Sequence, residues 1–233
     1  MIKKVKWFIK VLLGKEIIVF RDKKINSKWY GNTYAGFYVY DEVLNNNSIV
    51  YSFGIGEDIS FDEELINKFD CKVFGFDPTP KSICFIKNKK MSKKYSLQPY
   101  GLYNFDGNVE FLLPEDDDNV SCTIGNIRDY QSDKINKVSV PVLKFESIIS
   151  KIGSNKIDLL KLDIEGSEYD VIDEILNSNI KIDQICIEFH HRFSGISKKM
   201  TKSAIKKLRI KGYKLIAISN QAEEFTFAHE SII

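Results

Sequence analysis

The sequence predicts a doubly wound, mostly parallel α/β fold of the Rossmann-like kind, and two observations lead to this prediction. Short apolar runs alternate with amphipathic helical segments over most of the chain, which is typical of a parallel sheet with crossover helices. The 233 residues suit one α/β domain with an N-terminal extension, since 43% apolar residues fill a core and 28% charged residues cover it. We divide the chain into a basic N-terminal extension (1–45) and one folded domain (46–233).

The pattern begins with three strands and two helices. Strands are predicted over 49–53, 71–76 and 95–99, and helices over 61–69 and 82–88. Ligands of such sheets bind outside the carboxyl ends of the strands. The residues that end these strands are therefore the first candidates for a site.

The next segment contains extended runs without a helical pattern, and the α/β pattern then resumes. Extended runs over 109–113 and 138–143 predict an inserted β-hairpin. The later elements are a helix over 145–152 closed by Gly153, a strand over 157–162, a helix over 167–176, a strand over 182–189, a helix over 197–211, and a closing antiparallel pair over 213–219 and 224–228.

The composition excludes several classes of protein. A net charge of +2 gives no reason to expect a nucleic-acid partner. The four cysteines form no CxxC pair, so neither a zinc ribbon nor a thioredoxin-type site is expected. Sparse cysteines suit a reducing compartment, and we expect a cytoplasmic protein.

The N-terminal residues Met1 to Phe20 combine lysines with apolar side chains. Lys10 and Lys15 interrupt the apolar stretch, which makes it unlike a signal peptide and too charged to span a bilayer. As an amphipathic helix it packs on the domain or, alternatively, touches an anionic membrane surface peripherally.

The first motif is the turn after strand 49–53, which reads Ser52-Phe53-Gly54-Ile55-Gly56-Glu57-Asp58. Its two glycines permit a tight turn and a close approach of the backbone to a ligand. Asp77 lies about 20 residues further on, at the end of the second strand, where a carboxylate can accept hydrogen bonds from ribose hydroxyls.

The acidic residues of this turn discriminate between two classes of ligand. The pyrophosphate of a dinucleotide favours a helix N-terminus free of acid, but Glu57, Asp58 and Asp62 crowd this one. Carboxylates repel a diphosphate and attract a sulfonium and an ammonium. The turn therefore favours S-adenosylmethionine over a nicotinamide dinucleotide. An ordinary turn with Asp58 as a helix cap is the alternative.

The second motif spans Leu159 to Glu168. Asp163 ends a buried strand and is positioned to reach into a cleft. Glu165 and Glu168 follow at a helix N-terminus, where the dipole stabilises them regardless of function. We take Asp163 and Glu165 as catalytic candidates and explain Glu168 by capping.

The third motif spans Ile187 to Phe193 and contains His190 and His191 at a strand end. A histidine of near-neutral pKa can act as a general base, and side-chain alternation sends at most one of the two into the cleft. We choose His190, although either could be structural. A metal site of Asp163, Glu188 and His190 is an alternative without a supporting spacing rule, so we expect no metal.

The second motif carries a resemblance. Leu160 to Glu168 (LKLDIEGSE) closely resembles the signature LKIDIEGAE of FkbM-type methyltransferases. The resemblance covers roughly Ile49 to Ala228, and it implies a class I methyltransferase fold that binds S-adenosylmethionine and mostly methylates hydroxyls of sugars or secondary metabolites. Further blocks resemble that family in the same order: Tyr51–Phe61, Phe76–Pro80, Pro99–Leu102 and Glu188–Phe193.

The resemblance also implies roles for single residues. The commonest class I pattern has an acid two residues before the first glycine, where this sequence has Ser52. The contact to the amino group then comes from Glu57 or Asp163, and Ser52 stays a candidate cofactor residue. Carried over by position, Gly54, Gly56, Glu57 and Asp58 line the methionine end, Asp77 holds the ribose, Gly101 and Leu102 border the adenine, and Asp163 lies beside the methyl group, with Pro78 as a further cofactor-binding residue.

We therefore expect an S-adenosylmethionine-dependent O-methyltransferase that acts on a hydroxyl of a saccharide, a glycoconjugate or another small molecule, with a place in polysaccharide biosynthesis. One alternative is an NAD-dependent oxidoreductase on a Rossmann-like sheet. Another is a non-catalytic protein that binds the cofactor or joins a glycan-assembly complex. Acceptor contacts are expected in loops 113–131 and 194–200.

Overall fold

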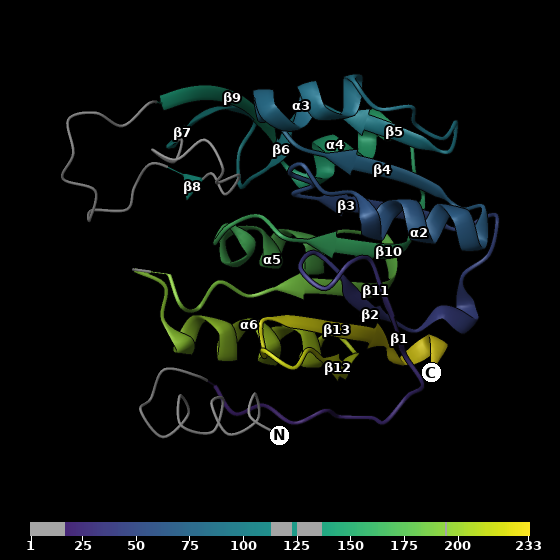
Figure 1. Cartoon of the computed structure of the whole chain (residues 1–233). Coiled ribbons are helices and arrows are strands. Elements are labelled where there is room, and N and C mark those ends of the chain that lie inside the picture. The colour runs from purple at the N-terminus through teal and green to yellow at the C-terminus, as the bar shows by residue number, and fades with distance from the viewer. Residues whose placement is uncertain (1–16, 113–122, 125–136, 194) are drawn as a thin grey trace.

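The computed structural model describes residues 17–112, 123–124, 137–193 and 195–233 (Figure 1). Seven strands form the central sheet, and only β13 runs antiparallel to its neighbours β11 and β12. The predicted mostly parallel sheet with an antiparallel C-terminal strand is confirmed. In spatial order the strands are β12 (Tyr213–Ile218), β13 (Glu224–His229), β11 (Lys181–Glu188), β10 (Lys156–Leu162), β3 (Ile49–Phe53), β4 (Lys72–Phe76) and β5 (Tyr95–Gln98).

Helices cover both faces of this sheet. Side chains of α4, α5 and α6 share one core cluster with Tyr51 and Phe53 of β3, and those of α2 and α3 share a second cluster with Val50. Successive side chains of a strand point to opposite faces, so one strand serves both clusters. The helices are α2 (Ser60–Phe69), α3 (Pro80–Lys87), α4 (Phe145–Ile152), α5 (Glu168–Asn177) and α6 (Lys198–Ile210).

Local residue choices set where the helices begin and end. The sequence predicted a helix from residue 82, but α3 begins at Pro80, because the Thr79 hydroxyl caps it by accepting from the Ser82 amide and because proline needs no partner for an N–H there. Helix α4 ends as predicted at Gly153, whose φ of 75° is the left-handed conformation that glycine adopts without strain.

The inserted segment is larger than the predicted hairpin. Strands β7 (Gly107–Leu112) and β9 (Lys137–Leu143) pair antiparallel, as a hairpin requires. Two short strands, β6 (Gly101–Leu102) and β8 (Thr123–Ile124), extend the pair into a four-stranded sheet of order β6-β9-β7-β8. Strand β6 could not be recognised from the sequence because two residues show no periodicity.

A hairpin of β1 (Lys28–Tyr30) and β2 (Phe37–Val39) precedes the predicted boundary at residue 46 but belongs to the packed unit. Its residues Tyr30, Phe37 and Val39 are buried in the same cluster as α2. The Asp41 carboxylate, in the 3₁₀ turn Asp41–Val43, accepts from the Tyr30 hydroxyl at 2.7 Å and from Lys28 at 2.9 Å. The second half of the extension is therefore fixed to the sheet.

The predicted amphipathic helix over Met1 to Phe20 falls mostly outside the described residues, and residues 17–20 are not helical. Much of both predicted acceptor loops also falls outside them. Within the described part of the chain, no helix combines the length and the apolar character needed to cross a membrane. A short 3₁₀ turn, Glu230–Ile232, ends the chain.

The strand order reverses between β3 and β10. From β3 the chain proceeds outward through β4 and β5, and after the insertion it returns to β10 and proceeds the other way through β11. Loops leaving the carboxyl ends of adjacent strands then diverge, which leaves a crevice at this point. The fold therefore places the three sequence motifs, which follow β3, β10 and β11, around one crevice.

Candidate active site

The carboxyl ends of β3, β4, β10 and β11 open into a cavity of about 560 Å³. It lies at the reversal of strand order, where the sequence predicted a ligand site. Of the predicted site residues, only Ser52 does not line this cavity. Those that line it are Gly54, Gly56, Glu57, Asp58, Asp77, Pro78, Gly101, Leu102, Asp163, Glu165 and His190.

Ser52 is misplaced for its predicted role. It is 1% exposed, and strand alternation directs it to the α2 side of β3, beside Asp62. Asp62 is itself buried in the first turn of α2, and burial raises the pKa of its carboxyl to about 6, against a lowering effect of Lys161.

The turn after β3 needs its glycines. Gly54 has a φ of 74° and Gly56 a φ of 54°. A Cβ atom at Gly54 would lie 1.6 Å from the carbonyl oxygen of Asp163, so only glycine allows the turn to pack against the end of β10. This close approach joins the first motif to the second.

The Asp77 carboxylate is held by neutral donors. One oxygen accepts from the Gly56 amide at 3.0 Å, and the other accepts from the Thr79 amide at 2.9 Å and the Thr79 hydroxyl at 2.6 Å. The oxygen that accepts from Gly56 keeps one further lone pair, whereas the oxygen that accepts twice from Thr79 is saturated. Asp77 can therefore accept one hydroxyl donor from a ligand without losing its own position.

A buried lysine links the two motifs, and the sequence reasoning missed it. Lys161 is 3% exposed. Its ammonium donates to the Gly54 carbonyl at 2.8 Å and lies 3.3 Å from an Asp163 oxygen. A buried charge requires such partners. A lysine inside the apolar run of a buried strand was the signal that could have identified it.

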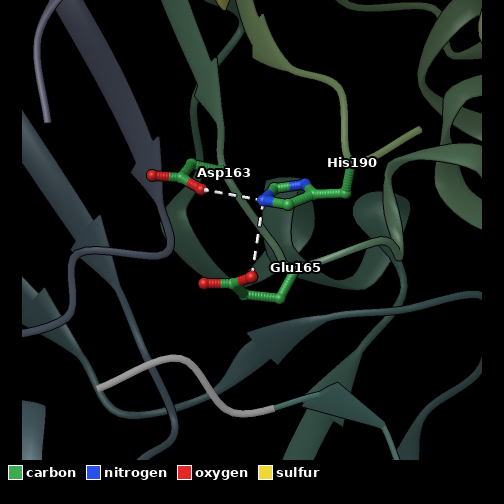
Figure 2. Close-up of side chains that lie close together, drawn as sticks. All are labelled: Asp163, Glu165 and His190. Carbon is green, nitrogen blue, oxygen red and sulfur yellow. Dashed lines mark ion pairs between the residues drawn. The ribbon is translucent and has the colours of Figure 1, made fainter. Parts of the chain in front are cut away.

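Four ionisable side chains converge at the ends of β10 and β11, and Figure 2 shows three of them, Asp163, Glu165 and His190. The Nε2 atom of His190 lies 3.4 Å from a Glu165 oxygen, 3.8 Å from a Glu188 oxygen and 3.9 Å from an Asp163 oxygen. Figure 2 shows the carboxylates of Asp163 and Glu165 turned toward this nitrogen. We call Asp163, Glu165, Glu188 and His190 the acid–histidine cluster.

Glu168, which the sequence explained as a helix cap, fixes this cluster. It is 0% exposed. One of its oxygens accepts from the amides of Ile164 and Gly166 at 3.0 and 3.2 Å, and lies 3.0 Å from Nδ1 of His190. Glu168 therefore holds the loop after β10 and aims Nε2 of His190 at the cavity. His191 is buried and does not line the cavity.

The charge state of the cluster differs from the one predicted. Burial lowers the pKa of His190, but the nearby carboxylates of Glu168, Glu165 and Asp163 outweigh it and raise that pKa to about 10. Burial, assisted by Asp163, raises the pKa of Glu188 to about 8. An imidazolium cannot accept a proton, so the ligand-free protein does not present His190 as the general base.

An N-terminal loop also reaches the cavity, although nothing in the sequence pointed to it. Tyr34 lines the mouth and is 82% exposed. The Asn32 side-chain oxygen accepts from the amides of Tyr34 and Ala35 at 2.7 and 2.8 Å, and the Asn32 amide donates to the Ser60 hydroxyl at 3.0 Å. The loop is thus fixed to the start of α2. Single loop residues carry no periodicity, so sequence analysis could not find them.

Comparison with known sequences settles the family. The sequence profile described as "Methyltransferase FkbM domain" matches residues 39–215, which is most of the chain. The chain belongs to the FkbM methyltransferase family. The resemblance of its LKLDIEGSE segment is thereby confirmed, and so is S-adenosylmethionine as the cofactor. An NAD-dependent oxidoreductase is no longer a tenable alternative for this FkbM domain.

Two curated relatives of this FkbM chain are named "Probable methyltransferase-like protein 24", one from Rattus norvegicus and one from Homo sapiens. Each is 23% identical, over 158 residues of the rat protein and 166 of the human protein. The matches cover 67% and 70% of this chain but only 36% and 38% of the relatives. The chain therefore corresponds to little more than a third of their length.

Solved structures give weaker likenesses. A precorrin-6y C5,15-methyltransferase from Geobacter metallireducens is 13% identical with a TM-score of 0.42, covering 80% of this chain and 83% of that one. A fibrillarin from Aeropyrum pernix in complex with S-adenosyl-L-methionine is 10% identical with a TM-score of 0.42, covering 79% and 66%. The class I arrangement of this FkbM domain rests on its own strand order.

Proposed function

We propose that this protein transfers a methyl group from S-adenosylmethionine to a hydroxyl oxygen of a saccharide or glycoconjugate. The observation that carries the proposal is the acid–histidine cluster, which faces the same cavity as the glycine turn. One side of the cavity can thus hold the cofactor while the other receives a hydroxyl. The saccharide class comes from the family resemblance and is the part that experiment must establish.

The residues of the cavity fit S-adenosylmethionine. Asp77 keeps one free lone pair for a ribose hydroxyl, and Gly101 and Leu102 line the same cavity with small and apolar surfaces for adenine. Glu57 and Asp58 lie on the turn where the ammonium of the methionine end would gain from negative charge. We infer that these residues are the cofactor contacts.

S-adenosylmethionine, when bound, supplies an electrophilic methyl group on a positively charged sulfur. The chain's own contribution is to align the acceptor oxygen and to remove its proton. Asp163 lies at the end of β10, held near Lys161 on one oxygen and near His190 on the other. We assign Asp163 as the proton acceptor, Glu165 as a second catalytic carboxylate and His190 as the positive charge that positions them.

The test combines cofactor binding with product detection. Purified full-length protein is incubated with methyl-labelled S-adenosylmethionine and a panel of sugars, oligosaccharides and hydroxylated small molecules, and the products are analysed by mass spectrometry. We expect label on a hydroxyl of a saccharide. Asp163→Ala should lose this transfer, whereas the matched control Asp173→Asn, which alters an exposed acid on α5, should retain it.

Each other outcome overturns a definite part of the proposal. Tight cofactor binding without product across the panel would support the non-catalytic alternative. Label on a non-carbohydrate acceptor would replace the substrate class. Unchanged transfer by Asp163→Ala would remove the assignment of the proton acceptor.

A further inference from the structure

The acid–histidine cluster has the composition of a metal site as well as of a proton relay. Ligand atoms of Asp163, Glu165 and His190 all lie within 4.8 Å of one another, and a Glu188 oxygen lies 3.8 Å from the same imidazole nitrogen. They come from the ends of two neighbouring strands and the loop after β10, so the sheet brings them together. One imidazole with several carboxylates is a donor set that divalent cations bind.

The imidazole is oriented as a metal ligand would be. His190 is 7% exposed, and its Nδ1 faces the fully buried Glu168 carboxylate at 3.0 Å. Metal-binding histidines typically direct their second ring nitrogen at such a carboxylate, which fixes the ring and the tautomer. Glu168 is in turn held by two backbone amides. The Nε2 atom is therefore aimed at the cavity by Glu168, which does not line it.

The spacing around Nε2 also fits. Charge-assisted hydrogen bonds between nitrogen and a carboxylate are usually about 2.7–2.9 Å long, whereas the three carboxylate oxygens stand 3.4, 3.8 and 3.9 Å from Nε2. Two donors that share one ion at about 2.1 Å lie about 3.0 Å apart at a right angle and about 3.4 Å apart at the tetrahedral angle. The Glu165 contact already has this spacing. A small rotation of the half-buried Asp163 side chain would bring its oxygen, the Glu165 oxygen and the Nε2 atom to one ion.

The charge balance of the acid–histidine cluster also favours a bound cation. Asp163, Glu165, Glu188 and Glu168 place four carboxyl groups around one imidazole, with Lys161 on the far side of Asp163. Largely buried carboxylates need a compensating cation or a proton. The arrangement therefore leaves room for additional positive charge at its centre.

We propose that Asp163, Glu165 and His190, with Glu188 beside them, bind a divalent cation of the Mg²⁺ or Mn²⁺ kind. The cation replaces the proton on Nε2, which leaves to solvent. It lies where the acceptor hydroxyl must come and holds that oxygen in the cavity. This role in acceptor binding rests on the proposed function, whereas cation binding itself does not. The sequence, which offered no spacing rule, led us to expect no metal.

The experiment is a titration of Mn²⁺ into the full-length, metal-stripped protein without cofactor, followed by electron paramagnetic resonance of the free ion and by calorimetry, with Mg²⁺ as competitor. We expect one site per chain. Glu165→Gln and His190→Gln should each weaken Mn²⁺ binding more than tenfold, and Glu168→Gln should weaken it by roughly 10–100-fold as an outer partner. The control Asp173→Asn should bind as the wild type does.

Circular dichroism and thermal melting show whether each variant is folded. If His190→Gln fails to fold, Glu165→Gln, which changes a partly exposed side chain, carries the test. No saturable Mn²⁺ or Mg²⁺ binding by the wild type would overturn the proposal, as would unchanged binding by folded Glu165→Gln and Glu168→Gln. Because the readout is binding, its failure is separate from a failure of methyl transfer.

Discussion

The two sides of the cavity hold their carboxylates by different means. On the side that we propose holds the cofactor, Asp77 is fixed by backbone amides and a hydroxyl within 3.0 Å. On the side that we propose receives the acceptor, Asp163, Glu165 and Glu188 surround a single imidazole at 3.4–3.9 Å. Neutral donors fix a geometry before any ligand arrives, whereas a group of charges depends on the cations present. The first side is thus preorganised, and the second responds to its ligands.

The largest effect on cofactor binding is expected from replacing a glycine on the preorganised side of the cavity. Gly54→Ala places a Cβ atom 1.6 Å from the Asp163 carbonyl oxygen at a φ of 74°. The turn must move, so we expect S-adenosylmethionine affinity measured by calorimetry to fall by more than tenfold, which is about 1.4 kcal/mol or more.

Gly153→Ala is the matched control for this change. Gly153 has nearly the same φ, 75°, but no heavy atom lies within 4 Å of its added Cβ. We expect it to lower stability by about 1–2 kcal/mol through backbone strain alone, with cofactor affinity unchanged. Equal effects of the two substitutions on affinity would show that the close approach at Gly54 is unimportant.

Asp62, the buried acid in the first turn of α2, gives a pH-dependent prediction. Burial raises the pKa of Asp62 to about 6 from 3.8, partly offset by Lys161 and Ser52 and reinforced by Asp58 and Glu63. The folded state therefore favours the neutral carboxyl. Its contribution is greatest below about pH 4, falls as pH rises to about 6, and is lost above it, a difference of about 3 kcal/mol.

Asp62→Asn removes this titration, so the variant should gain stability over the wild type as the pH rises from 4 to 7. Urea unfolding at each pH measures the difference in the free energy of unfolding between the two proteins. A difference that stays constant across this range would mean that Asp62 is ionised in the fold.

Glu168→Gln tests the side of the cavity whose carboxylates surround His190. The amide can still accept from the backbone amides of Ile164 and Gly166, but His190 loses its anionic partner. We expect kcat to fall by roughly tenfold or more, as for other carboxylates that orient a metal-binding histidine. Cofactor affinity should stay within twofold, and a matching loss in both would assign Glu168 a general structural role.

The smallest effect is expected at the mouth of the cavity. Tyr34→Ala changes an 82% exposed side chain in a loop that Asn32 holds in place, so stability should shift by less than about 0.5 kcal/mol. Because Tyr34 lines the mouth of the cavity, we propose that it contacts the acceptor, so KM for the acceptor should rise several-fold with cofactor affinity preserved. Tyr34→Phe should behave as the wild type if the ring makes the contact, and unchanged kinetics in both would exclude the loop from acceptor binding.

Sequence reasoning found the residues that strand ends position and missed those placed by tertiary packing. Gly54, Asp77, Asp163 and His190 follow buried strands, and the crevice rule for parallel sheets brings such residues together. Ser52 was wrongly included because alternation along β3 directs it away from the cavity.

The site residues that the sequence did not reveal were missed for a different reason. Lys161, Glu168 and Tyr34 depend on which groups lie opposite them: a glycine carbonyl, an imidazole and a cavity mouth. Those neighbours are far away in the sequence or belong to loops, where periodicity carries no information. The family signature contained Lys161 and Glu168, but their roles became visible only with the fold.

The most direct test of the account is a crystal structure with sinefungin, an analogue in which a carbon replaces the sulfur and an amine replaces the methyl group. The account predicts adenosine over the ends of β3 and β4 with its ribose on Asp77, and the amine directed toward Asp163. An adenosine bound elsewhere, or an amine turned away from the acid–histidine cluster, would contradict it.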